Sequence, residues 1–325
     1  MKRFYHSTAA VLGLGMLFLT GSTTMADAAT SSPMITKNSV IYNLSAGTEL
    51  MTGDTTYQIG YPVTSPSGVT FNDGYFPISE LAWPLDIWLA RLEGHATLNN
   101  QWRLNGTLKK NLTTPGDNMA DSDWLTAGNP GRLDVYSESE ISSFDAFIMD
   151  VDVDWTFMRR NTISFYAGLG LLYQNFNYDG KLIHQYSPSG LPGMEYYGDG
   201  SVAIAYEMTY TMPYLKLGTD LQVTPKFALA GSFSYSPLVN AEDTDEHLLR
   251  NKISSGDMDG NAYMFDFSGK YMFTPALFLE AGFHYLNIQV DGTTGQSFYG
   301  VPYATVTEES ESTQTSGNVS IGFKF

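Results

Sequence analysis

The last nine residues, GNVSIGFKF (317–325), alternate strictly between apolar and polar side chains. On an extended chain this spacing places the polar residues on one face and the apolar ones on the other, namely Val319, Ile321, Phe323 and Phe325. A strand with one apolar face and an aromatic residue at its end is typical of the last strand of a bacterial outer-membrane β-barrel. Such a barrel requires further strands of this kind and an export signal.

The first residues, MKRFYHSTAAVLGLGMLFLTGSTTMADAA (1–29), have the composition of such a signal. Lys2 and Arg3 form a basic start, an apolar segment covers 9–19, and Ala26-Asp27-Ala28 is a small-residue cleavage pattern. The apolar segment is shorter than the roughly 20 residues that a membrane helix needs. The sequence predicts a signal peptide at 1–28 and a single barrel domain at 29–325.

Composition narrows the possible partners. The 325 residues include no cysteine, so disulfide bonds do not hold the fold. There are 34 acidic residues against 17 Lys and Arg, a net charge of -17. This charge argues against a nucleic-acid partner and favours cationic substrates. The 21 Tyr, 19 Phe and 5 Trp suit lipid-facing and interfacial positions.

Alternating stretches recur along the chain, separated in turn by short turns and long polar loops. The short turns lie near 98–102, 158–162, 222–227 and 272–278, and the long loops at 62–75, 113–141, 183–200, 241–259 and 291–313. Ten strands fit between them: 39–61, 76–97, 102–112, 142–157, 163–182, 201–222, 226–240, 260–273, 277–290 and 314–325. The pattern predicts an all-β fold, a ten-stranded antiparallel transmembrane β-barrel with long outer loops and short periplasmic turns. A soluble β-sandwich explains the alternation, but not the turn and loop asymmetry.

Two acidic clusters fall in the outer loops of this topology. Asp121 and Asp123 lie in MADSDW (119–124), and Asp243, Asp245 and His247 lie in AEDTDEH (241–247). Residues two apart on an extended chain point to the same side. A carboxylate beside a histidine orients the imidazole as a general base, and two close carboxylates can hold and polarise a water. Together these groups could direct water onto a peptide carbonyl without a metal or a side-chain nucleophile.

Other interpretations of the clusters remain open at this point. Acidic runs are usually solvated loop residues. A calcium loop would need glycine-spaced oxygen ligands, and zinc would need more than one nearby histidine or cysteine. Neither pattern is present in the two clusters.

The two clusters, on a ten-stranded barrel, resemble the omptin family of outer-membrane aspartyl-type proteases. NMADSDWLTAGNPG (118–131) and AEDTDEH (241–247) carry the specific part of the resemblance, and SELAW (79–83), YTMPYLKLG (210–218) and YMFTPALFLEAGF (271–283) support it. The similarity covers the chain from the first strand to Phe325. The resemblance implies a monomeric endopeptidase whose active site faces outside the cell and which uses no cofactor.

The resemblance also assigns roles to individual residues. Asp121 and Asp123 match the aspartate couple of the family, and Asp245 and His247 match its Asp–His dyad, in which the histidine is the base. Omptins cut beside basic residues through acids in the substrate groove. Asp243 matches one of these acids. Asp54 in TGDTTY is the best match for the second, with Glu49 as the alternative.

One departure concerns lipopolysaccharide, on which omptin activity depends. The family binds this lipid with basic side chains on outer barrel strands. Here YQNFNYDG (173–180) has Asn175 and Asn177, and Thr209 stands where an arginine is expected. The sequence therefore puts the lipid dependence in doubt.

The rival hypothesis is a barrel that is not an enzyme, such as an adhesin, a receptor or a narrow channel. An omptin-like scaffold that has lost catalysis is a third, which the intact Asp121, Asp123, Asp245 and His247 argue against. The expected partners are thus cationic peptides or proteins and the outer-membrane lipid.

Overall fold

The structure is a computed structural model that describes residues 40–126 and 128–325. The predicted signal peptide, 1–28, and the start of the predicted barrel domain, 29–39, lie outside the described residues. The described chain is almost entirely strand, with one helical turn, η1 (Leu248–Arg250). No helix in the described ranges is long and apolar enough to cross a membrane.

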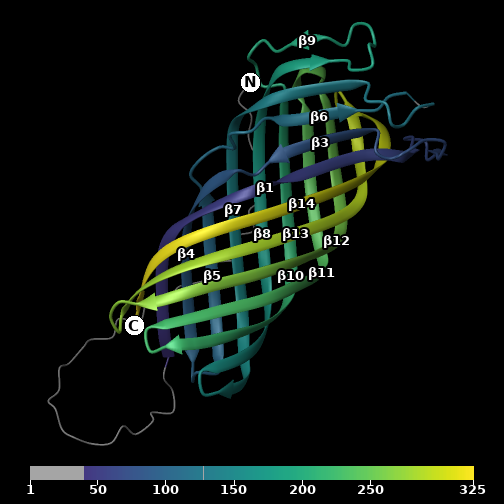
Figure 1. Cartoon of the computed structure of the whole chain (residues 1–325). Helices are drawn as coiled ribbons and strands as arrows, with labels where there is room; N and C mark the ends of the chain where they lie inside the picture. Colours follow the sequence, from purple (N-terminus) through teal and green to yellow (C-terminus); the bar gives the residue numbers. More distant parts are fainter. Residues whose placement is uncertain (1–39, 127) are drawn as a thin grey trace, which may run out of the picture. The chain divides into compact units, whose positions relative to one another are not determined.

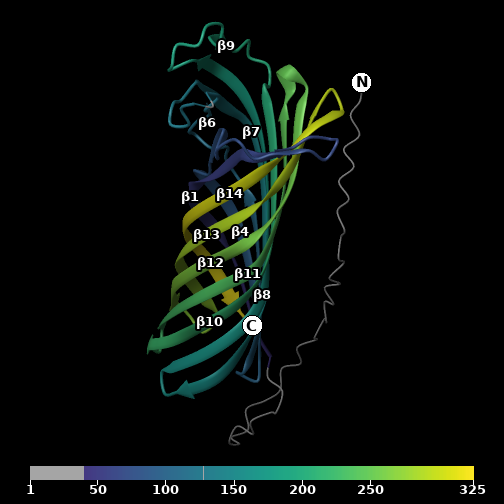
Figure 2. The same ribbon diagram turned by 90° about the vertical axis from the view of Figure 1, so that its right-hand side faces the viewer.

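The strands pair with their neighbours in antiparallel order and close into a ring (Figures 1 and 2). Its members are β1 (Val40–Thr64), β3 (Ser79–Pro84), β4 (Ile87–Leu98), β5 (Trp102–Asn111), β6 (Met119–Asp123), β7 (Val135–Arg160), β8 (Ile163–Tyr186), β10 (Ile204–Thr224), β11 (Phe227–His247), β12 (Lys252–Met272), β13 (Leu277–Phe298) and β14 (Val301–Lys324). β3 with β4, and β5 with β6, each form one interrupted strand, so the ring has ten members as predicted. The short β2 (Thr70–Phe71) and β9 (Tyr196–Tyr197) lie in outer loops.

Alternation along the strands separates a lipid-facing surface from a polar interior. Leu217 and Phe267 point outward and are 61% and 55% exposed. Residues that point inward include Glu49, Asp154 and Gln314, which are buried. Only a closed barrel satisfies every backbone group of a strand within a bilayer, because lipid offers no hydrogen bonds.

The four predicted short turns are confirmed, and they join strands at one end of the barrel. Each leaves only two to four residues between strands, at 99–101, 161–162, 225–226 and 273–276. Asn99, Asn100 and Asn161 have positive φ angles of 51°, 55° and 46°, a conformation that asparagine tolerates in tight turns. Pro225 and Pro275 lie in the other two turns, outside the ladders.

At the outer end the strands are longer than predicted. Of the predicted loops 241–259 and 291–313, only 248–251 and 299–300 lie outside strands. The pairing of β11 with β12 continues to His247 and Lys252, and that of β13 with β14 to Phe298 and Val301. Above the membrane the outward face is solvated, so both faces carry polar side chains. The alternation of hydrophobicity that marks a strand is therefore lost there, although the ladder continues.

A cluster of aromatic side chains fills the lumen below the outer rim. Trp83 stacks on Tyr206 with ring centroids 5.0 Å apart and an interplanar angle of 7°, and it packs against Tyr178 at 4.9 Å. Tyr57 of β1 packs against Tyr206, with ring centroids 5.9 Å apart. All four side chains are almost fully buried. This layer separates the residues at the rim from the polar lumen below.

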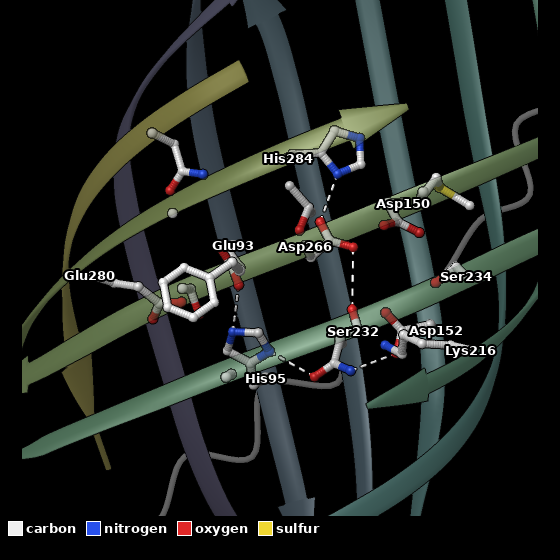
Figure 3. Close-up of a pocket in the computed structure, with 18 of the residues that line it drawn as sticks. Glu93, His95, Asp150, Asp152, Lys216, Ser232, Ser234, Asp266, Glu280 and His284 are labelled. Atoms are coloured by element: carbon white, nitrogen blue, oxygen red, sulfur yellow. Dashed lines mark hydrogen bonds and ion pairs between the residues drawn. The ribbon is translucent and has the colours of Figure 1, made fainter. Parts of the chain in front are cut away.

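The lower lumen holds a polar cavity of about 340 Å³ (Figure 3). Ion pairs line its wall: Lys216 lies 2.9 Å from Asp154, and His284 lies 2.6 Å from Asp266, its partner on the neighbouring strand. His95 lies 2.7 Å from Glu93. Polar and charged side chains on the inward faces thus pair with one another, as expected for a narrow interior that side chains fill rather than a wide pore.

Candidate active site

The end of β11 carries the predicted Asp–His dyad. Asp243 and Asp245 point inward and are 4% and 0% exposed, whereas Glu242 lies on the outer face. His247 Nε2 lies 3.0 Å from Asp245 Oδ2. This is an ion-pair distance, although neither oxygen of Asp245 has a partner with hydrogen-bond geometry among the described residues. The strand spacing of two thus brings the dyad together as predicted.

Asp121 and Asp123 lie on β6, a short strand between β3 and β7. In the β3–β6 ladder Asp121 is opposite Leu81 and Asp123 is opposite Ser79. β6 and β11 are four positions apart around the ten-membered ring, so the two pairs approach from opposite walls of the barrel.

The pKa shifts of Asp121 and Asp123 indicate that their carboxyl groups lie within electrostatic range of Asp245 and His247. Burial raises the pKa of Asp121 well above its ordinary value, and the charges of Asp123 and Asp245 add to the shift. Burial also raises the pKa of Asp123, while the Ser79 hydroxyl and the charge of His247 oppose that shift. Asp121 and Asp123 are both half-buried, and two neighbouring carboxyl groups hold a proton between them more readily than isolated carboxyl groups do.

The pKa of Asp245 is shifted in the opposite direction. Burial alone would raise the pKa of this carboxyl, but the charges of His247, Lys252 and Arg250 lower it below its ordinary value. Asp245 is therefore a buried anion. An anion next to one ring nitrogen stabilises the imidazolium that forms when the other nitrogen accepts a proton.

Two basic residues beside the dyad were missed by the sequence analysis, which placed LLRNK (248–252) in a polar loop. Arg250 Nη2 lies 3.1 Å from both ring nitrogens of His247. Lys252 is the register partner of His247 on β12 and is 7% exposed. Their closeness in sequence to Asp245 and His247 was a usable signal, because a tight hairpin returns the chain to the same site.

Asp243 forms a buried acidic pair with Glu308 of β14. A Cβ atom on Gly256 would lie 1.9 Å from Glu308 Oε2 and 2.8 Å from Asp243 Oδ1, so both carboxyl groups converge on this glycine. The Gly256 N–H donates to Asp243 Oδ1 at 3.1 Å. Burial raises the pKa of each acid; the charge of Asp243 adds to the shift of Glu308, and that of Asp245 to the shift of Asp243. At the inner end of the rim, the pair offers a negative site lined by Tyr57 and Tyr206.

The structure does not bring Asp54 to this acidic pair. Asp54 is exposed on the outer face of β1, where it pairs with Thr313 and Pro84. The alternative, Glu49, is buried deeper in the lumen and pairs with Lys109 at 2.7 Å and Arg91 at 2.9 Å. At the level of Asp243, the inward side chain of β1 is Tyr57, and the second acid comes from β14 instead.

A closed barrel with apolar residues on its outer face and an Asp–His cluster at its rim belongs to the class of integral outer-membrane barrels. The Omptin family model matches residues 69–325. The chain belongs to the omptin family and is a protein of the bacterial outer membrane.

The relatives are distant in sequence. Protease 7 of Escherichia coli (strain K12) is 28% identical over 172 residues, which cover 50% of this chain and 54% of that protein. Outer membrane protease OmpP of the same organism is 27% identical over 206 residues, 59% of this chain and 58% of the relative. The chain thus spans about half the length of the curated relatives it matches. The crystal structure of outer membrane protease OmpT from Escherichia coli matches with a TM-score of 0.71 at 17% identity, over 88% of this chain and 97% of that one.

Proposed function

We propose that this omptin is an endopeptidase that hydrolyses peptide bonds next to basic residues at the outer rim of the barrel. The observation that carries the proposal is the 3.0 Å contact of His247 with Asp245, which lies within electrostatic range of Asp121 and Asp123. A histidine oriented by a buried carboxylate, opposite two carboxyl groups that can hold a water, is an arrangement suited to general-base catalysis.

The geometry indicates how the proton moves. Nε2 of His247 faces Asp245, so in the proposed mechanism Nδ1 accepts a proton from water, and the Arg250 guanidinium, 3.1 Å from this nitrogen, must first move away. The water oxygen then forms a bond to the carbonyl carbon, and the π electrons of the carbonyl group move to its oxygen. When the C–N bond breaks, the imidazolium returns the proton to the leaving amine. Asp121 and Asp123 orient the water through the proton that they share.

Recognition of a basic residue is assigned to Asp243 and Glu308. Deep burial makes a carboxylate without a cation costly, so a lysine or arginine side chain that enters would be favoured over a neutral one. The raised pKa values of both acids fit this view, because the pair carries a proton that a cationic side chain would displace.

Hydrolysis of a basic peptide is the direct test. Refolded protein in detergent micelles is expected to cut a quenched-fluorescence peptide with a central Arg or Lys, and to cut the matched Gln peptide at least about tenfold more slowly, a difference of about 1.4 kcal/mol. Wild-type protein that cuts neither peptide would support the non-enzyme hypothesis. Measurement of conductance in planar bilayers would then test whether the barrel is a channel.

A second prediction concerns lipopolysaccharide. Asn175 donates to Thr209 at 2.9 Å and to Glu207 at 3.0 Å, and Asn177 donates to Asn175 at 2.6 Å. This outward-facing cluster contains no cation, so it offers a lipid phosphate no charge-assisted hydrogen bond. Activity is expected to be similar in micelles with and without lipopolysaccharide. Stimulation of kcat/KM by more than about tenfold, or about 1.4 kcal/mol, would contradict this prediction.

A further inference from the structure

Lys252 is a buried cation that the mechanism above does not use. It begins β12, directly opposite His247 in the ladder, and its side chain points into the barrel. Only 7% of Lys252 is exposed, yet it forms no ion pair or hydrogen bond with any described side chain. A buried ammonium group normally has a paired carboxylate, because the charge is costly to desolvate. Lys252 thus lies at the site with its donors unused.

The groups around Lys252 are those of the proposed active site. Their charges act on its pKa: Asp245 from β11 and Asp121 and Asp123 from β6 raise it, whereas burial, the largest effect, and Arg250 of η1 lower it. His247 is its ladder partner, and Tyr303 of β14 lies near Arg250 and Asp245. No carboxylate among them takes Lys252 as a direct partner, so the ammonium is held near the reacting groups and remains available.

Hydrolysis by water requires such a donor. The attack of water moves an electron pair onto the carbonyl oxygen, and preorganised donors for this oxyanion are usually a large part of catalysis. Asp121, Asp123 and Asp245 accept hydrogen bonds in their ionised forms and would repel a developing negative charge. Arg250 already lies against the ring of His247 at 3.1 Å. Lys252 is the remaining cation beside the dyad in the described part of the chain.

We propose that Lys252 is a catalytic residue whose ammonium group stabilises the oxyanion formed on the substrate carbonyl oxygen. The inference rests on the proposed endopeptidase function and adds a role that neither the couple nor the dyad can perform. The ammonium donates to the carbonyl oxygen as the C–O bond to water forms. It releases that oxygen when the C–N bond breaks and the charge is neutralised.

Lys252→Met and Lys252→Gln are expected to lower kcat by about 10²–10³-fold with little change in KM. Lys252→Arg keeps a cation and is expected to recover part of the loss. A peptide phosphonate, which is tetrahedral and anionic, is expected to lose affinity in Lys252→Met by a similar factor, while a product peptide does not. The control Lys181→Met removes a positive charge from the outward face of β8 and is expected to act as wild type.

The pH profile separates stabilisation of the oxyanion from an effect on the carboxyl groups. If Lys252 acts only through Asp121 and Asp123, its removal will raise the pKa of the acid limb. An acid limb that moves in this way, with unchanged phosphonate affinity, would overturn the proposal. So would Lys252→Met with wild-type kcat. An inactive wild type would refute the endopeptidase function and this inference with it, whereas an active wild type with an equally active variant refutes the inference alone. Heat modifiability on gels confirms that each variant has folded.

Discussion

His247→Ala is expected to lower kcat by about 10²–10⁴-fold, the range that a general base contributes. In the proposed mechanism the imidazole accepts a proton from water and returns it to the leaving amine, a role that Asp121, Asp123 and Asp245 do not fill. Asp245→Asn is also expected to lower kcat. The amide can donate a hydrogen bond to Nε2 of His247, but it does not stabilise the imidazolium. The measurement is kcat and KM for an Arg or Lys peptide, with refolded protein.

His184→Ala is the matched control for this prediction. His184 also lies at the outer end of the barrel, where it stacks on Tyr197 with centroids 4.3 Å apart and lies 3.6 Å from Glu195. Its removal is expected to leave kcat unchanged. The assignment of the base would be wrong if His247→Ala kept wild-type kcat, or if both histidine variants lost activity equally.

Glu308→Gln and Asp243→Asn are expected to lower kcat/KM for Lys and Arg peptides by about 10- to 100-fold. Each replaces a carboxylate that bonds a cation, an interaction of about 1.5–3 kcal/mol, by a neutral amide. Cleavage of a matched Gln peptide is expected to change little. The ratio of kcat/KM for the basic and neutral peptides is therefore the quantity to measure.

The same pair predicts a pH dependence of substrate selection. Because burial raises the pKa of both Asp243 and Glu308, the pair loses its shared proton, and becomes more negative, as the pH rises through a range above that of ordinary carboxyl groups. Discrimination in favour of the basic peptide is thus expected to strengthen from mildly acidic to mildly alkaline pH. In Glu308→Gln this dependence is expected to weaken.

Asp54→Asn is the control for the acidic pair. The side chain is exposed on the outer face of β1, so its neutralisation is expected to leave the selectivity as in wild type. If Asp54→Asn reduced the preference for basic peptides and Glu308→Gln did not, Asp54 rather than Glu308 would be the second acid.

Much of the fold could be predicted because membrane strands alternate between apolar outward and polar inward side chains, a pattern that is visible in the sequence. Alternation in GNVSIGFKF and similar stretches indicated strand, and the lengths of the connections separated the two ends of the barrel. The number of barrel strands and the four short turns follow from these features alone. The strand ends above the membrane do not, because solvent covers the outer face there. Residues 241–247 consequently appeared to be loop, although they complete β11.

The residues of the site, like the fold, could be predicted only in part. Asp121 with Asp123, and Asp245 with His247, are neighbours in sequence, so a spacing of two on a strand was enough to place each pair on one face. The sequence by itself thus determined the barrel, which of its connections are short and which are long, and the two halves of the cluster. Only the tertiary structure decided which acid joins Asp243 and which cation faces His247. The shear and closure of the barrel set which inward side chains meet across the lumen, and they place Glu308 rather than Asp54 beside Asp243. The β11–β12 hairpin brings Lys252 opposite His247.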